Sequence, residues 1–181
     1  MGEHDLTKED GEQKVRVCST TLHPHYNQGK IDNDFAILRL CSPVSFSRDV
    51  STVCLPSSSS NNYDNVQAIA SGWGTLSSGG RQPSILMEVT LDTMSNSECT
   101  NNNNYSGQQI TANMICAGRG GKSTCYGDSG GPLVTKENNG SFSLIGVVSH
   151  GGKCGKVSIS TKKYIVFKML TFPRTASAEA C

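Results

Sequence analysis

Short stretches with the residue pattern of β-strands recur along this 181-residue chain, and they limit its possible folds more than any other feature. ILMEVTL (85–91) alternates apolar and polar positions, and FSLIGVVS (142–149) is apolar on both faces, as a buried strand is. In NDFAILRL (33–40), alternate apolar residues follow an Asn-Asp turn. Loops rich in Gly, Ser and Asn separate these stretches, and helical periodicity is scarce. The pattern predicts an all-β sandwich or barrel.

Charge and hydropathy exclude several classes of protein. The net charge is +1, and charged residues make up 17% of the chain without forming blocks. This balance gives no reason to expect nucleic acid or a membrane surface as a partner. No apolar run approaches the 18 residues that a membrane-spanning helix needs. The composition therefore indicates a soluble globular protein.

The eight cysteines are widely spaced and form no CxxC pair or Cys/His cluster with zinc spacing. In a chain rich in Gly, Ser and Asn, this spacing favours disulfides and an oxidising compartment. The first ten residues, MGEHDLTKED, are charged and lack the apolar core of a signal peptide. We therefore expect a secreted protein whose N-terminus, with its signal peptide, is missing from this sequence.

The stretch TCYGDSGGPLV (124–134) places Ser129 among glycines, a setting typical of an activated nucleophile in a tight turn. SGWG (71–74), MICAG (114–118), GDSGGPLV (127–134) and IGVVSHGG (145–152) occur in the order and at the spacing of trypsin-like serine proteases. NDFAILRL and VCLP match the same family upstream. From about Gly2 to Cys154, the sequence resembles this family.

The resemblance implies an all-β fold with a trypsin-like double Greek-key β-barrel. Residues 1–55 would be the remaining part of the first barrel, 56–65 a linker between the barrels, and 66–156 a nearly complete second barrel. Residues 157–181 would form an aberrant tail that does not match the family. Because this tail lacks the family's last strand and closing helix, we expect an unpaired edge and an exposed core in the second barrel.

The resemblance also implies a serine endopeptidase that acts through an acyl-enzyme. Ser129 would attack the peptide carbonyl, and the backbone N–H groups of Gly127 and Ser129 would stabilise the oxyanion. Asp34 matches the acid that orients the catalytic histidine. Ser149 matches the serine that hydrogen-bonds this acid. Asp128 matches the buried acid that pairs with the new N-terminus after zymogen cleavage.

The base of the triad is the missing component. The chain has four histidines, His4, His23, His25 and His150, and none matches the AAHC motif that supplies the base in this family. His150 replaces a tryptophan on the wall of the substrate cleft. We therefore expect the chain as given to be an inactive, truncated piece of an endopeptidase. Two alternatives are a non-catalytic homologue that acts as a binding or cofactor module, and a gene remnant that never folds.

The family's specificity pocket can be matched to this sequence. Its floor would be Ser123, six residues before the nucleophile, and an uncharged floor resembles that of chymotrypsin. Gly151 would open the wall, while Ser149 and His150 would line the cleft. These residues imply a preference for large apolar or aromatic side chains. The expected partners are protein and peptide substrates and protein protease inhibitors, and no cofactor is required.

Disulfides and a structural calcium are also implied by the resemblance. Cys54 and Cys181 are left over and are expected to be free. Glu3 and Glu12, with Asp10 close by, resemble the family's calcium-binding loop, but the spacing is one residue short, so a solvated acidic loop is the alternative. The three implied disulfides are Cys99–Cys116, Cys125–Cys154 and Cys18–Cys41.

Overall fold

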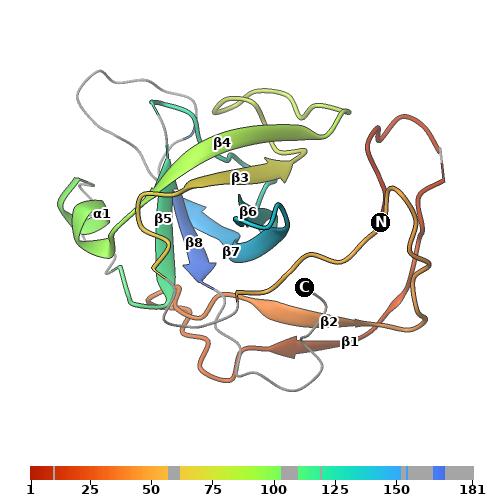
Figure 1. Cartoon of the computed structure of the whole chain (residues 1–181), viewed down its shortest axis with the longest axis horizontal. Helices are drawn as coiled ribbons and strands as arrows, with labels where there is room; N and C mark the ends of the chain where they lie inside the picture. Colours follow the sequence, from red (N-terminus) through yellow and green to blue (C-terminus); the bar gives the residue numbers. More distant parts are fainter. Residues whose placement is uncertain are drawn as a thin grey trace.

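Strands dominate the computed structural model, which describes residues 1–9, 11–56, 62–102, 110–118, 120–151, 154 and 165–169. A small sheet contains β1 (Val17–Leu22) and β2 (Ala36–Leu40). The second sheet contains β3 (Gln67–Gly72), β4 (Met87–Met94), β5 (Met114–Gly118), β6 (Pro132–Lys136), β7 (Phe142–Gly151) and β8 (Ile165–Met169). In Figure 1 the small sheet lies below the second sheet, to which helix α1 (Asn96–Asn102) is attached.

The second sheet closes into a barrel in the strand order β3-β4-β5-β8-β7-β6, with every pair antiparallel. The alternation in residues 85–91 and the apolar run at 142–149 correspond to β4 and β7. Burial of the small and branched side chains inside the barrel is the main source of its stability. The buried core residues are Ala68, Ala70, Leu91, Ile115, Ala117, Leu133, Ile145 and Val148.

The predicted open edge of this barrel is not present. Strand β8 pairs with β5 on one side and β7 on the other, so the expectation of an unpaired edge was wrong. The physical reason is the segment YIVFKML, which contains β-branched and aromatic residues that favour strands although the segment lacks the family's usual sequence. The barrel therefore extends beyond the predicted boundary at residue 156.

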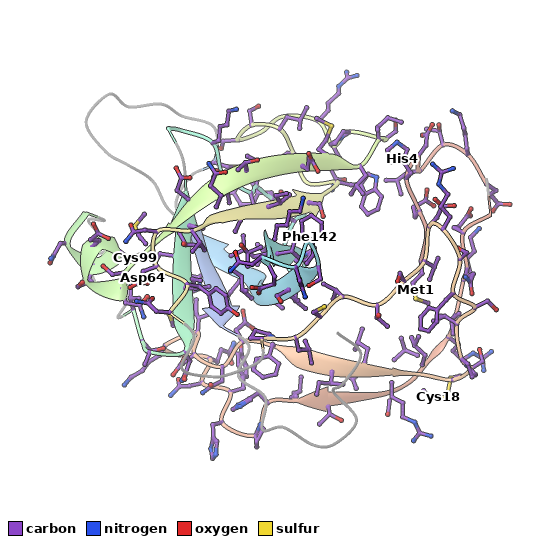
Figure 2. The ribbon with its side chains drawn as sticks, in the orientation of Figure 1. Met1, His4, Cys18, Asp64, Cys99 and Phe142 are labelled. Carbon is purple, nitrogen blue, oxygen red and sulfur yellow. A yellow bond between two sulfur atoms is a disulfide. The ribbon has the colours of Figure 1, made fainter. Side chains whose placement is uncertain are left out.

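The small sheet carries the exposed apolar surface instead. Every residue of β1 and all but the last residue of β2 are exposed. A two-stranded sheet of this kind has no face covered by a core and is marginally stable by itself. The Cys18–Cys41 disulfide joins β1 to the residue that follows β2, and Figure 2 shows Cys18 at one end of this sheet. The large apolar side chains exposed on the sheet are Val17, Leu22, Ile37 and Leu38.

Helix α1 begins with a capping box. The Glu98 N–H donates to the Ser95 hydroxyl (3.2 Å), and the Ser95 N–H donates to the Glu98 carboxylate (3.4 Å). The Cys99–Cys116 disulfide then ties the helix to β5. In the described part of the chain, no helix is long and apolar enough to cross a bilayer.

The bonding of the cysteines can now be compared with the sequence predictions. The structure forms Cys18–Cys41, Cys99–Cys116 and Cys125–Cys154, the three pairs that the resemblance implies. Cys54 is disulfide-bonded as well, so the expectation that it is a free thiol was wrong. The Cys54 backbone forms a parallel bridge with Ser143 of β7, donating to the Phe142 carbonyl (3.0 Å) and accepting from the Leu144 N–H (2.8 Å). Cys181 lies outside the described residues.

Candidate active site

Ser129 lies in a tight turn that leads into β6. Gly127 and Gly130, on either side of it, adopt φ angles of 97° and 83°, a left-handed region that side chains disfavour. The turn is attached to β7 because the Val148 carbonyl accepts from the Gly130 N–H and the Val148 N–H donates to the Gly131 carbonyl, both at 2.9 Å. Ser129 is exposed. The local sequence thus presents the serine hydroxyl to solvent beside the end of β7.

Backbone N–H groups in this turn fall into two sets. The Asp128 N–H donates to the Cys125 carbonyl (3.1 Å), and the Gly131 N–H donates to the Asp128 carbonyl (2.8 Å). By contrast, the N–H groups of Gly127 and Ser129 donate to no other described residue. The turn therefore leaves two neighbouring donors for a ligand, as an oxyanion site requires.

A chain of hydrogen bonds connects Asp34 to His150 through Ser149. The Ser149 hydroxyl donates its one proton to Asp34 Oδ2 at 2.6 Å. Its oxygen must therefore accept from His150 Nδ1, 3.1 Å away, which places a proton on that nitrogen. Adjacent side chains of a regular strand point to opposite faces, but the register shifts between Val148 and His150, and this irregularity allows the contact.

The other three histidines lie in different surroundings. His4 is exposed in the N-terminal segment, and Figure 2 shows it well above Met1. The His23 ring packs against Phe35, with 4.9 Å between the ring centroids, and its Nδ1 accepts from the His25 N–H (3.1 Å). Within the described residues, none of these three imidazoles hydrogen-bonds a member of the Asp34–Ser149 pair.

Asp128 is held by backbone amides. The Gly74 N–H donates to its Oδ1 and the Cys125 N–H to its Oδ2, each at 2.8 Å. The space beside this carboxylate is too small for a side chain: a Cβ atom on Gly72 would lie 2.2 Å from Oδ1, and one on Gly74 would lie 2.4 Å from the carboxyl carbon. The glycines of the SGWG motif therefore leave the space that the Asp128 carboxylate occupies. The hydrogen bond from Gly74 to Asp128 holds the turn that carries Ser129.

The residues expected to form the specificity pocket lie on two segments, one just before this turn and one at the end of β7. Ser123 is half-buried and precedes Thr124, which is 5% exposed and whose hydroxyl has no hydrogen-bond partner within the described residues. Gly151 is exposed at the end of β7. The Cys125–Cys154 disulfide joins the segment that carries Ser123 to the chain just beyond β7.

The acidic loop does not fit the calcium site that the resemblance implies. Lys14 Nζ lies 3.3 Å from Glu12 Oε1 and also contacts Glu9, and the hydrogen bonds to Glu9 and Glu12 raise the pKa of Lys14. The Glu3 carboxylate accepts from the next backbone amide (2.9 Å), and Asp10 lies outside the described residues. An ammonium group neutralises the carboxylates but cannot coordinate a metal, so it takes the place of the cation.

We expect calcium to leave the thermal unfolding midpoint of this protein unchanged, because Lys14 already neutralises the loop. In the Lys14→Gln variant the midpoint should fall and should then rise again with millimolar calcium. Lys8→Gln is a matched control, since Lys8 pairs with Asp5 (3.1 Å) outside this group. Calorimetry with calcium or a chelator measures the effect. A calcium-dependent rise in the unsubstituted protein would contradict the assignment.

These features define a class of protein: a closed β-barrel with an exposed serine, two backbone N–H groups that donate to no described residue, and a carboxylate–hydroxyl pair that includes Ser149 of the neighbouring strand β7. They are features of serine hydrolases. The Trypsin family model matches residues 1–168, so the chain belongs to the trypsin family of serine endopeptidases.

Similarity to individual proteins agrees with the family. The chain is 39% identical to "Trypsin-1" of Astacus astacus over 86% of its own length and 65% of that protein's. It is 42% identical to "Cationic trypsin-3" of Rattus norvegicus, with 90% and 64% covered. It is 41% identical to "Transmembrane protease serine 11G" of Rattus norvegicus, with 78% and 34% covered. The chain therefore spans less than two thirds of each of these relatives.

The sequence did not indicate two features of this site. The first is the hydrogen bond between Ser149 and His150, which depends on a strand irregularity with no clear signature in the residues. The second is Lys14, whose charge and position two residues after Glu12 were a usable signal. An acidic loop that ends in a lysine can neutralise itself.

Proposed function

We propose that this chain carries the nucleophile side of a serine endopeptidase site that works through an acyl-enzyme. Ser129 is the nucleophile, and the N–H groups of Gly127 and Ser129 stabilise the oxyanion of the tetrahedral intermediate. The strongest support comes from which backbone N–H groups of the turn donate hydrogen bonds and which do not. Each N–H from Asp128 to Gly131 donates within the protein except that of Ser129, and the N–H groups of Ser129 and Gly127 donate to no described residue.

Asp34 is the acid of this site, and Ser149 orients it. None of the four histidines matches the base of the family, and the Ser129 hydroxyl hydrogen-bonds no described residue. The chain as given therefore has little peptidase activity. Well-studied members of this family that lose one triad residue keep about 10³–10⁴-fold acceleration over water. The same observation favours a second candidate function, a non-catalytic homologue that binds peptides or acts as a cofactor module.

Asp128 is the activation switch of this site. In the structure both of its oxygens accept from backbone amides, those of Gly74 and Cys125. A chain end that reached Asp128 would add a charged donor to this carboxylate, and such a pair would hold the turn more firmly.

The pocket prefers large apolar or aromatic side chains, as in chymotrypsin, because its floor is the uncharged Ser123. Binding can test this preference without turnover. We expect indole to bind the protein and benzamidine to bind weakly, whereas Ser123→Asp should improve benzamidine affinity by about tenfold or more through a charge-assisted pair. Calorimetry measures both ligands, and Ser78→Asp, on an exposed loop, is the control. Equal benzamidine affinity in all three proteins would contradict the assignment of the floor.

The covalent structure and the family support a proposal for the compartment and the partners of the protein. Three disulfides join described residues, and disulfides persist in oxidising compartments. The protein is secreted, its substrates are proteins and peptides, and protein protease inhibitors are its other partners. Resistance of the folded chain to glutathione at cytosolic strength would support this setting, and rapid reduction of the barrel disulfides would argue against it.

A further inference from the structure

The turn before β2 adopts an unusual backbone conformation on both sides of Asp32. Ile31 has φ of 49° and Asn33 has φ of 53°, and both residues carry side chains. Left-handed conformations are uncommon for such residues and are rarest for β-branched ones like isoleucine. A turn of this kind persists only where surrounding contacts hold it in place. Because Asp34 is the next residue, these contacts determine where its carboxylate lies.

Some of the contacts are local to the turn. The backbones of Asn27 and Asp32 exchange two hydrogen bonds, both at 3.0 Å, and the Asn33 side chain donates to the His25 carbonyl at 3.0 Å. Asn27 also accepts from the Lys30 N–H at 3.1 Å. These bonds shape the turn, but they do not connect it to the barrel.

The Asp32 carboxylate makes the connection. The Thr111 hydroxyl donates to Oδ1 at 2.9 Å, and the Asn113 amide donates to Oδ2 at 3.4 Å. Both donors lie just before β5, on the barrel. In the described part of residues 17–40, Asp32 and Asp34 are the two residues whose side chains hydrogen-bond the barrel. They contact it at different elements, β5 and β7.

We propose that Asp32 is a positioning residue that holds Asp34 against Ser149. One hydrogen bond, from Ser149 to Asp34, leaves the turn able to rotate about that contact. A second attachment two residues earlier removes this freedom and keeps the backbone in its left-handed conformation. Hydrogen bonds to a charged acceptor are stronger than neutral ones, so Asp32 suits this role. The proposal rests on the proposed function only in that Asp34 is the acid of the site.

The coupling between Asp34 and Ser149 tests the proposal directly. A double-mutant cycle of Asp34→Asn and Ser149→Ala, measured by urea unfolding of the whole chain, gives this coupling as a ratio of equilibrium constants. We expect a factor of about ten in the unsubstituted protein, as for hydrogen bonds to charged groups. In an Asp32→Ala background the factor should fall to about one, because the two side chains no longer meet. Asp49→Ala, which removes an exposed carboxylate, should leave it at about ten, as for distant sites.

A residue that merely stabilises the fold would lower stability without changing the factor, so a factor of ten that persists in Asp32→Ala would overturn the proposal. If Asp32→Ala does not fold, Thr111→Val removes one donor, and the factor should fall to about three. An unchanged factor in that variant would also overturn it. These measurements do not depend on the reactivity of Ser129. A failure of the proposed endopeptidase function would therefore be seen separately, in the indole and benzamidine binding of the unsubstituted protein and Ser123→Asp.

Discussion

Replacing Gly74 by alanine should lower the free energy of unfolding by about 3 kcal/mol, because the new methyl group would overlap the Asp128 carboxylate and displace a hydrogen bond. The methyl carbon would lie 2.4–2.6 Å from three atoms of that carboxylate, and the Gly74 N–H that donates to it would have to move. Gly74 is buried, so the overlap cannot be relieved toward solvent. Urea unfolding, with the midpoint compared at constant slope, measures the loss.

Gly29→Ala is the matched control. A Cβ atom there would meet only the Asn27 side chain at 3.5 Å, an ordinary contact distance. We expect its free energy of unfolding to change by less than about 0.5 kcal/mol, as for most surface substitutions. If Gly74→Ala changed the free energy of unfolding as little as this control does, the carboxylate of Asp128 would not lie against Gly74 of the SGWG motif. The account of how the Ser129 turn is held would then fail.

Removing the Cys125–Cys154 disulfide should destabilise the barrel by about 3–4 kcal/mol. The two cysteines are 29 residues apart, and opening a loop of this length releases that much chain entropy in the unfolded state. The bond also braces the segment between Ser123 and Ser129. The Cys125→Ser/Cys154→Ser double variant avoids a single unpaired thiol. Trp73 is the chain's one tryptophan and follows β3, so its fluorescence reports unfolding of the barrel.

The Cys18→Ser/Cys41→Ser variant provides the comparison. These cysteines are 23 residues apart, so the loop-closure entropy is similar, but Cys18 lies in the exposed strand β1 and Cys41 directly follows β2. We expect the Trp73 transition to keep its midpoint in this variant, because the small sheet contributes little to the barrel core. Equal losses of stability in the two variants, measured at Trp73, would mean that the two sheets unfold as one unit, contrary to this description.

Much of the barrel could be predicted from the sequence, because alternation and apolar runs determine where strands are buried. The stretches at 85–91 and 142–149 became β4 and β7. Strand β8 was missed because its segment does not resemble the family, although the β-branched and aromatic residues in YIVFKML favour a strand in any context. Helix α1 was also missed, even though Ser95 and Glu98 have the spacing of a capping box.

The site could be predicted only through the resemblance, since a sequence by itself does not place Asp34 beside Ser149, 115 residues away. Long-range contacts depend on the register of the strands and on irregularities within them. The approach of His150 to Ser149 follows from such an irregularity. The anchoring of Asp32 to Thr111 and Asn113 likewise depends on how two distant turns meet. Motifs identify the reacting groups, whereas tertiary packing decides what orients them.

The central claim is that Ser129 has the surroundings of a nucleophile but no histidine in this chain that activates it. A fluorophosphonate probe, with labelling at Ser129 measured by mass spectrometry, tests this most directly. Ser129→Ala and His150→Ala are the comparison variants, and an intact trypsin relative confirms that the probe is reactive. The account predicts that the unsubstituted chain is labelled no more than Ser129→Ala. Strong labelling at Ser129 would contradict it, and loss of that labelling in His150→Ala would identify His150 as the base.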